Sequence, residues 1–178
     1  MELYVFTDGS VSKIGIASYG AILTELNDDD FKIIKTKSGR CRNVLTLSSF
    51  EAESEGLLHG LKLLETCLYL NKGKVKSVTL IVDNEQIKLA LEGNLSAIKR
   101  EMIPLWHEIA KLRFGIISTV PIACKNIKSH YLEWEKIKDA KERTQRRKEI
   151  ASLTKKERRI YKMNARADKL CLSAQSIL

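Results

Sequence analysis

The chain has 178 residues, with 31 Lys and Arg against 22 Asp and Glu, a formal net charge of +9 and a pI near 9.4. This length predicts one domain with a sizeable core, and no apolar run in the sequence is long enough to span a bilayer. The four cysteines lack a C-x-x-C spacing, which argues against structural zinc and favours unpaired thiols in a reducing, cytoplasmic compartment. The basic charge suits a polyanionic partner, although a basic protein without one is the plain alternative.

The first third of the chain reads as strands. Residues 2–8 alternate and then become apolar, which predicts a central strand. Residues 15–25 and 31–37 are expected to form an antiparallel meander, with Asn27-Asp28-Asp29-Asp30 as the turn between them.

Helices then alternate with strands. Leucines at helical spacing predict an amphipathic helix over residues 50–71, with Gly73 as its C-cap. Further elements are expected at residues 76–82 (strand), 84–92 (helix), 102–112 (helix) and 118–127 (strand). A meander followed by alternating helices and strands predicts a mixed sheet with helices on its faces.

The segment 131–163 is unusual in composition. It holds twelve basic and six acidic residues, contains neither Gly nor Pro, and is rich in helix formers, so we expect it to be helical. Thr154 and Glu157 have the spacing of a capping box that starts the final helix. On that helix Asn164 and Asp168 are four residues apart and share a face.

Two interpretations of this basic segment remain open. It is either a solvated charged helix that supports the final helix, or an arm that contacts the backbone of a nucleic acid. The second interpretation assigns the contact to four cations: Arg143, Arg146, Arg147 and Lys148.

Four carboxylates are candidates for a common site. Asp8 and Asp83 each end an apolar, β-branched run, Glu53 lies on the first predicted helix, and Asp168 lies on the last. Bringing four acids together costs electrostatic repulsion, and a pair of divalent cations is the usual physical reason to do so.

Five short motifs occur in order along nearly the whole chain: Thr7-Asp8-Gly9-Ser10, Ala52-Glu53, Asp83-Asn84, Ser129-His130, and Asn164 with Asp168. In content and order they resemble the catalytic core of the type 1 ribonuclease H family. The resemblance implies a single ribonuclease H-like domain over residues 1–178, an α/β fold with a five-stranded mixed sheet flanked by helices. The segment 131–163 departs from the family, which usually has a short glycine-containing loop here, and is expected to be a basic helical insertion.

The position of the catalytic glutamate has two possible registers. Ala52-Glu53 with Gly56 one turn later fits the family pattern. Taking Glu51 instead places His59 where the family has leucine, so Glu53 is favoured.

The resemblance also implies an activity, which is hydrolysis of the RNA strand of RNA–DNA hybrids with two Mg²⁺ ions, or Mn²⁺. Asp8 is expected to bridge both ions. Glu53 and Asp83 are expected to hold the ion near the leaving group, and Asp168 the ion that carries the water. His130 is expected to accept a proton or to ease product release.

The expected partner is an RNA–DNA hybrid duplex. The protein is expected to bind it as a monomer, and no association with a membrane is expected. Besides the basic segment, the expected contacts to the duplex are Gly9, Ser10, Ser48, Ser49, Asn84 and Asn164. Ser48 and Ser49 stand where the family often has asparagines. Two alternatives stay open: a nuclease or strand-transfer enzyme of the same fold acting on DNA, and a nucleic-acid-binding module with reduced activity.

Overall fold

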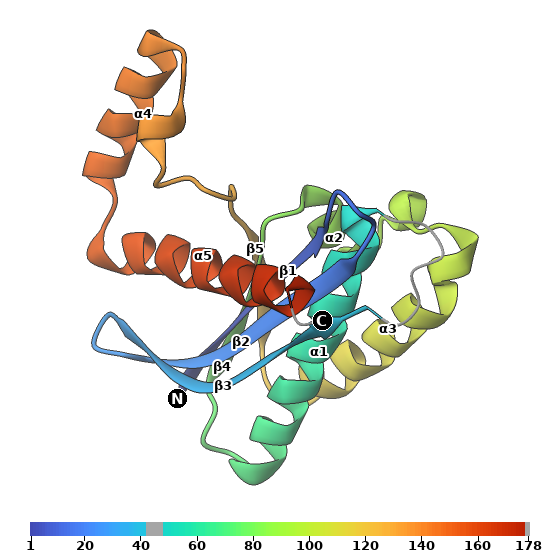
Figure 1. Ribbon diagram of the computed structural model, residues 1–178. Helices are drawn as coiled ribbons and strands as arrows, with labels where there is room; N and C mark the ends of the chain where they lie inside the picture. The colour runs from blue at the N-terminus through green and yellow to red at the C-terminus, as the bar shows by residue number, and fades with distance from the viewer. Residues whose placement is uncertain (42–47, 177–178) are drawn as a thin grey trace.

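The computed structural model describes residues 1–41 and 48–176. Within these residues the strands are β1 (Glu2–Val11), β2 (Ala17–Asn27), β3 (Asp30–Arg40), β4 (Ser77–Val82) and β5 (Ile122–Asn126). They form one sheet in the order β3-β2-β1-β4-β5 (Figure 1). β1, β2 and β3 are an antiparallel meander, whereas β4 and β5 run parallel to β1. The predicted five-stranded mixed sheet is therefore confirmed.

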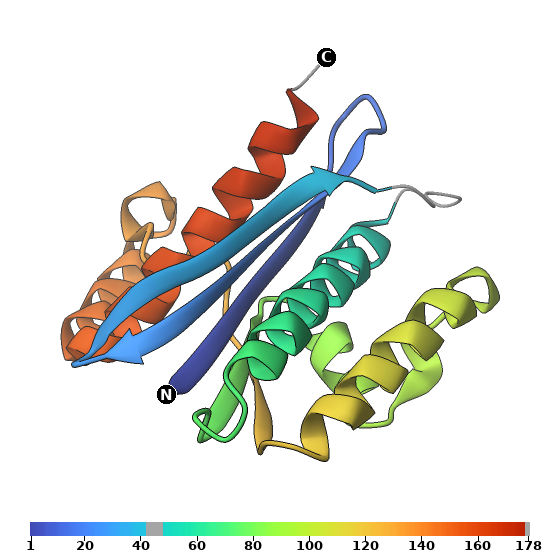
Figure 2. The ribbon, with the colours of Figure 1, turned by 90° about the horizontal axis from the view of Figure 1, so that it is seen from below.

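The helices are α1 (Ser49–Leu70), α2 (Glu85–Leu91), α3 (Ile103–Ile117), α4 (Ala140–Ser152) and α5 (Lys155–Gln175), with short 3₁₀ turns η1 (Leu95–Ala97), η2 (Arg100–Met102) and η3 (Trp134–Lys136). The sheet lies between α5 on one face and α1 with α3 on the other (Figure 2). In the part of the chain that the structure describes, no helix combines the length and the apolarity needed to cross a bilayer.

The central strand β1 contributes to a core on each face of the sheet. Leu3 and Val5 pack into the cluster beneath α1 and α3, while Tyr4 and Phe6 pack into the cluster beneath α5. Because both faces of β1 are covered, its sequence is apolar almost throughout instead of alternating with polar residues.

Most element boundaries follow local chemistry. Asp28 and Asp29 have φ of 45° and 64°, as a tight hairpin turn requires, so the turn predicted at this point is confirmed. Helix α1 ends with Asn71, not Gly73, as its C-cap, and Gly73 (φ 73°) belongs to the turn that follows.

Two predicted boundaries were wrong. The helix expected over 102–112 continues to Ile117, because Ile116 is buried in the core and extends the packed face. The strand expected over 118–127 begins only at Ile122, since the N–H of Val120 still donates to the carbonyl oxygen of Ile116 (3.0 Å).

The basic segment expected to be helical over 131–163 is helical only in part. Residues 131–139 form turns and η3, residues 140–152 form α4, and residues from 155 onward belong to α5, so the insertion before the final helix is residues 131–154. Asp139 caps α4 by accepting a hydrogen bond from the N–H of Glu142 (2.8 Å). The predicted capping box is present, with Thr154 Oγ1 accepting from the N–H of Glu157 (3.2 Å) and Glu157 Oε2 accepting from the N–H of Thr154 (2.8 Å). Helix α4 projects from the body of the molecule beside the start of α5 (Figure 1).

Candidate active site

The parallel pairing of β1 and β4 brings the first two carboxylates together. Phe6 pairs with Ile81, and continuing this register by two residues sets Asp8 beside Asp83, which directly follows β4. Asp8 is only 6% exposed, and its Oδ1 accepts a hydrogen bond from the N–H of Gly9 (2.7 Å). Both side chains therefore lie at one end of the sheet.

Two glycines let α1 lie directly against β1. A Cβ on Gly9 would lie 2.1 Å from the backbone N of Glu53, and a Cβ on Gly56 would lie 2.7 Å from the carbonyl oxygen of Asp8. No side chain fits at either place, so the helix and the strand meet backbone to backbone. This contact sets Glu53 next to Asp8.

A third glycine brings in α5 from the other face of the sheet. Gly20 on β2 pairs with Asp8, and a Cβ on Gly20 would lie 2.4 Å from the carbonyl oxygen of Ala167. Asp168, the next residue of α5, is thereby held at the same end of the sheet. Asn164, one turn earlier, is 3% exposed.

Electrostatic interactions link the four carboxylates. Burial, followed by the charges of Asp83 and Asp168, raises the pKa of Asp8 to about 8. Burial, followed by the charges of Asp83 and Asp8, raises the pKa of Glu53 to about 8. The structure therefore places the four predicted carboxylates in one electrostatic cluster, which we call the carboxylate cluster.

Neighbouring polar side chains hold the cluster in place. Burial raises the pKa of Asp83, while hydrogen bonds from Ser129 and Asn164 act in the opposite direction. A hydrogen bond from Asn84 similarly opposes the rise in the pKa of Glu53. In the sequence, Ser129 stands out only as the neighbour of His130, and no local pattern marks it as a partner of Asp83.

The donor set of the cluster fits a hard divalent cation. All of its ligand atoms are oxygens, the type that Mg²⁺ prefers. Glu53 Oε2 and Asn164 Oδ1 are buried without a hydrogen-bond partner, as expected of atoms that lack their ligand. Across residues 1–41 and 48–176, however, no group of three or more His, Cys, Asp or Glu side chains is arranged so that it could hold a metal ion. The chemistry of the donor atoms suits a divalent cation, and metal binding itself stays a prediction.

Glu51, the alternative to Glu53, has different neighbours. Its N–H donates to the side-chain Oγ of Ser48, which caps the start of α1 (3.3 Å). Burial, then Glu55 and more weakly Glu51, raise the pKa of the Cys41 thiol. Glu51 therefore lies near Ser48 and Cys41, whereas Glu53 interacts with Asp8 and Asp83.

His130 lies at the edge of the site. Its backbone has φ of 52°, a left-handed conformation that is uncommon for residues other than glycine and recurs at functional sites. The imidazole is half-exposed, and its Nδ1 lies 3.4 Å from Glu133 Oε2. His130 directly follows Ser129, the hydrogen-bond partner of Asp83.

The residues predicted to bind nucleic acid fall into two groups. Gly9, Ser10, Ser48, Ser49, Asn84 and Asn164 lie on β1, at the starts of α1 and α2, and on α5. Ser48 and Asn84 each use a side-chain oxygen to cap a helix, and Asn164 is buried against Asp83. The second group, Arg143, Arg146, Arg147 and Lys148, lies on the projecting helix α4.

Comparison with known proteins gives matches in structure alone. No family model and no curated protein matches the sequence. Ribonuclease H1 from Halobacterium salinarum NRC-1 superposes with a TM-score of 0.62 at 14% identity over 98% of each chain. LC11-RNase H1, isolated from compost and solved in complex with an RNA/DNA hybrid, gives 0.62 at 17% identity over 97% of this chain and 95% of its own.

A viral enzyme matches over a smaller part of its length. The prototype foamy virus protease-reverse transcriptase gives a TM-score of 0.62 at 16% identity, over 99% of this chain and 21% of its own. At these identities the likeness concerns the fold, and it agrees with the resemblance carried by the five motifs. The chain therefore has the ribonuclease H-like fold.

Proposed function

We propose that this protein is a metal-dependent endonuclease that hydrolyses the RNA strand of RNA–DNA hybrids. The observation that carries the proposal is the convergence of Asp8, Glu53, Asp83 and Asp168 from β1, α1, the end of β4 and α5. A protein of the same fold, LC11-RNase H1, was solved in complex with an RNA/DNA hybrid. The excess of basic residues suits a polyanionic substrate.

The four carboxylates would hold the metal ions. Asp8 would serve as a ligand to both ions of a pair. Glu53 and Asp83 would be ligands to the ion that assists the leaving oxygen, and Asp168 would be a ligand to the ion that activates the attacking water. A bound divalent cation supplies an activated water and neutralises charge that develops on the phosphorus and the leaving oxygen.

Protons would neutralise part of the cluster when it holds no cation. With pKa values of about 8, Asp8 and Glu53 retain much of their protonation at neutral pH, which reduces the repulsion among the carboxylates. A cation must displace these protons, so its affinity should increase with pH. Ser129 and Asn164 would keep Asp83 oriented during this exchange.

His130 would transfer a proton through Nε2. Its Nδ1 faces Glu133 Oε2 at 3.4 Å, which leaves the other ring nitrogen directed elsewhere. Its half-exposed position allows exchange with solvent. This role suits proton transfer or product release better than metal binding.

A nuclease acting on DNA is the second candidate. A foamy viral protease-reverse transcriptase of the same fold was solved in complex with double-stranded DNA, with a TM-score of 0.56 to this chain.

One assay separates the candidates. Matched RNA–DNA, RNA–RNA and DNA–DNA duplexes are incubated with the protein and Mg²⁺ or Mn²⁺, and the products of each strand are resolved. We expect cleavage of the RNA strand of the hybrid alone. Cleavage of DNA without cleavage of the hybrid would favour the second candidate. Binding without any cleavage would identify a binding module.

A further inference from the structure

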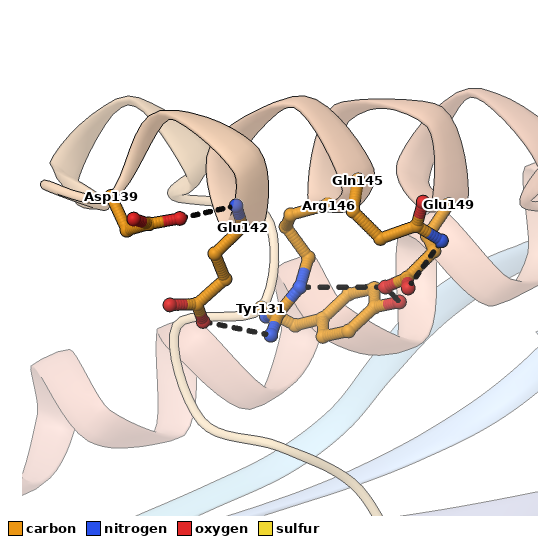
Figure 3. A network of polar contacts seen from close by, with 6 residues as sticks. All are labelled: Tyr131, Asp139, Glu142, Gln145, Arg146 and Glu149. Carbon is orange, nitrogen blue, oxygen red and sulfur yellow. Dashed lines mark hydrogen bonds and ion pairs between the residues drawn. The ribbon is translucent and has the colours of Figure 1, made fainter.

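The insertion is fastened by its own aromatic and charged side chains. Tyr131 O–H donates to Glu149 Oε2 (2.8 Å), and the guanidinium of Arg146 lies 4.3 Å from the centre of the Tyr131 ring (Figure 3). Arg146 also approaches Glu149 (3.5 Å) and Glu142 (4.0 Å), and its side chain is 16% exposed. Arg146 is thus engaged in holding α4 to the segment that precedes it.

A second stacking contact fixes the insertion against the final helix. The rings of Tyr131 and Tyr161, on α5, stack with their centres 4.6 Å apart and an interplanar angle of 17°. Arg147 likewise lies over the ring of Trp134 (5.3 Å). Two of the four cations that were predicted to contact nucleic acid, Arg146 and Arg147, therefore have partners within the insertion. Residues 128–133 are held close to α5.

A cavity of about 470 Å³ lies between residues 128–133 and α5. His130 and Asn164, both near the carboxylate cluster, line it, so the cavity adjoins the candidate site. Four cations also line it: Lys128, Lys162, Arg166 and Lys169.

These cations are arranged in a row. Lys162, Arg166 and Lys169 have the i, i+4, i+7 spacing that places side chains on one face of a helix. All three are exposed, and no salt bridge joins them or Lys128 to a carboxylate of the described residues.

Charge within the cavity is strongly unbalanced. Glu133 is the acidic residue in its lining, and it is already paired with Lys136 (2.7 Å) and with His130 (3.4 Å). Four exposed cations on one side of the candidate site create a local positive potential, which suits the phosphates of a nucleic acid backbone. The two tyrosines that line the cavity are less suited to stacking on a nucleic acid base, because Tyr131 and Tyr161 already stack on one another.

We propose that this cavity, created by the insertion, binds the backbone phosphates of the duplex that flank the cleaved linkage. Lys162, Arg166 and Lys169 would contact successive phosphates beside the carboxylate cluster, with Lys128 closing the opposite wall. The insertion would then position the duplex by buttressing this cavity against α5, and the contacts of α4 itself would be secondary. The inference rests on the proposed function, because it takes a nucleic acid duplex as the substrate.

The first test compares two triple variants of equal charge. Lys162→Gln/Arg166→Gln/Lys169→Gln removes the row. Lys72→Gln/Lys74→Gln/Lys76→Gln removes three lysines that precede β4, at the end of the sheet opposite Asp83. Hybrid affinity is measured in EDTA across a salt series. Since both variants lose three charges, their net charge is matched, and a difference between them reports the charges that lie beside the cavity.

We expect the row variant to bind the hybrid about tenfold or more weakly than the control variant at low salt. Its slope of log affinity against log salt should flatten by up to about 0.9 for each phosphate of a B-form duplex that the variant no longer touches, with a different coefficient for a hybrid. Melting temperatures should stay close to wild type, because the side chains are exposed. Equal affinities and equal slopes for the two variants would overturn the inference.

The second test locates the contact on the substrate. A neutral methylphosphonate is placed at successive linkages on each side of the cleavage point, one per duplex. Wild type should bind more weakly when one or two flanking linkages are neutral, and the row variant should be insensitive at those same linkages. Equal reductions in affinity for both proteins at every linkage would show that the row touches no particular phosphate.

The two proposals fail in distinguishable ways. If wild type neither binds nor cleaves the hybrid, the proposed function is wrong. If wild type cleaves it and the row and control variants behave alike, the hydrolase stands and the phosphate cavity is wrong.

Discussion

The carboxylate cluster and the basic insertion are held by opposite means. The cluster lies where α1 and α5 approach the sheet so closely that Gly9, Gly56 and Gly20 have no room for a Cβ. The insertion is held by side chains stacked above one another, with Tyr131 between Arg146 and Tyr161 in the chain of contacts. Backbone contacts leave little freedom of adjustment, whereas stacked side chains can open and close. Substitutions should therefore act on chemistry in the first region and on substrate binding and local order in the second.

The largest effect is expected at Asp8, whose carboxylate interacts with each of the other three in the cluster. Asp8→Asn removes a charge needed for metal binding and should lower hybrid cleavage by roughly 10³-fold, which corresponds to about 4 kcal/mol of transition-state stabilisation. Circular dichroism and melting in EDTA should show an intact fold. Near-normal cleavage by this variant would show that the site lies elsewhere.

The two glutamates at the start of α1 give the next comparison. Glu53→Gln should lower the cleavage rate on a scale similar to Asp8→Asn, because Glu53 interacts with Asp8 and Asp83. Glu51→Gln, the matched control two residues away, should change the rate less than about threefold, well under 1 kcal/mol. Single-turnover rates decide the register, and the reverse pattern would assign the metal to Glu51.

Stability should depend on the glycine at the contact of helix and strand. Gly56→Ala would place a Cβ 2.7 Å from the carbonyl oxygen of Asp8 and should cost about 1–3 kcal/mol of unfolding free energy. Gly115→Ala in α3 is the control, since a Cβ there meets nothing within 4 Å and should stabilise by roughly 0.5–1 kcal/mol. Urea unfolding measures both, and equal effects would mean that α1 can shift away from β1.

The pH dependence of stability should reveal the buried acids. The pKa values of Asp8 and Glu53 are raised from 3.8 and 4.5 to about 8, so the folded state binds more protons than the unfolded state between these limits. Their contribution is fully present below about pH 4 and is lost as pH rises through 8.

Melting temperatures measured in EDTA from pH 5 to 9 test whether stability falls as the pH rises. The melting temperature should fall with pH in wild type and less steeply in Asp8→Asn. Glu65→Gln, which changes an exposed acid on α1, should follow wild type. A slope unchanged by Asp8→Asn would contradict the burial of this carboxyl in the metal-free protein.

The smallest effect is expected in the insertion. Arg146→Ala removes the contacts to Tyr131, Glu142 and Glu149 and should cost about 1 kcal/mol of local stability. Hydrogen exchange should become faster in α4 while the global melting temperature hardly changes. Arg143→Ala, an exposed position on the same helix, is the control and should leave exchange unaltered.

Local chemistry allowed many features to be predicted from the sequence. The apolar run before Asp8, the Asn27–Asp30 turn and the Thr154–Glu157 capping box depend on neighbours within a few residues, and all three are present as predicted. The end of the helix beyond residue 112 was missed because burial of Ile116 is a property of the packed core. The sheet and its flanking helices followed from motif order and periodicity.

For the candidate site, the sequence by itself determined which carboxylates were available, because each ends an apolar run or lies on an amphipathic helix. Only the tertiary structure decided how they meet, through the β1–β4 register and the contact of Gly20 with Ala167. The partnership of Ser129 with Asp83 was likewise not predictable, since it joins the ends of two strands.

The basic residues show the same division. Their number was plain in the sequence, but stacking on Tyr131 and Trp134 decided which arginines have partners within the insertion, and the cavity beside α5 decided which cations face the candidate site.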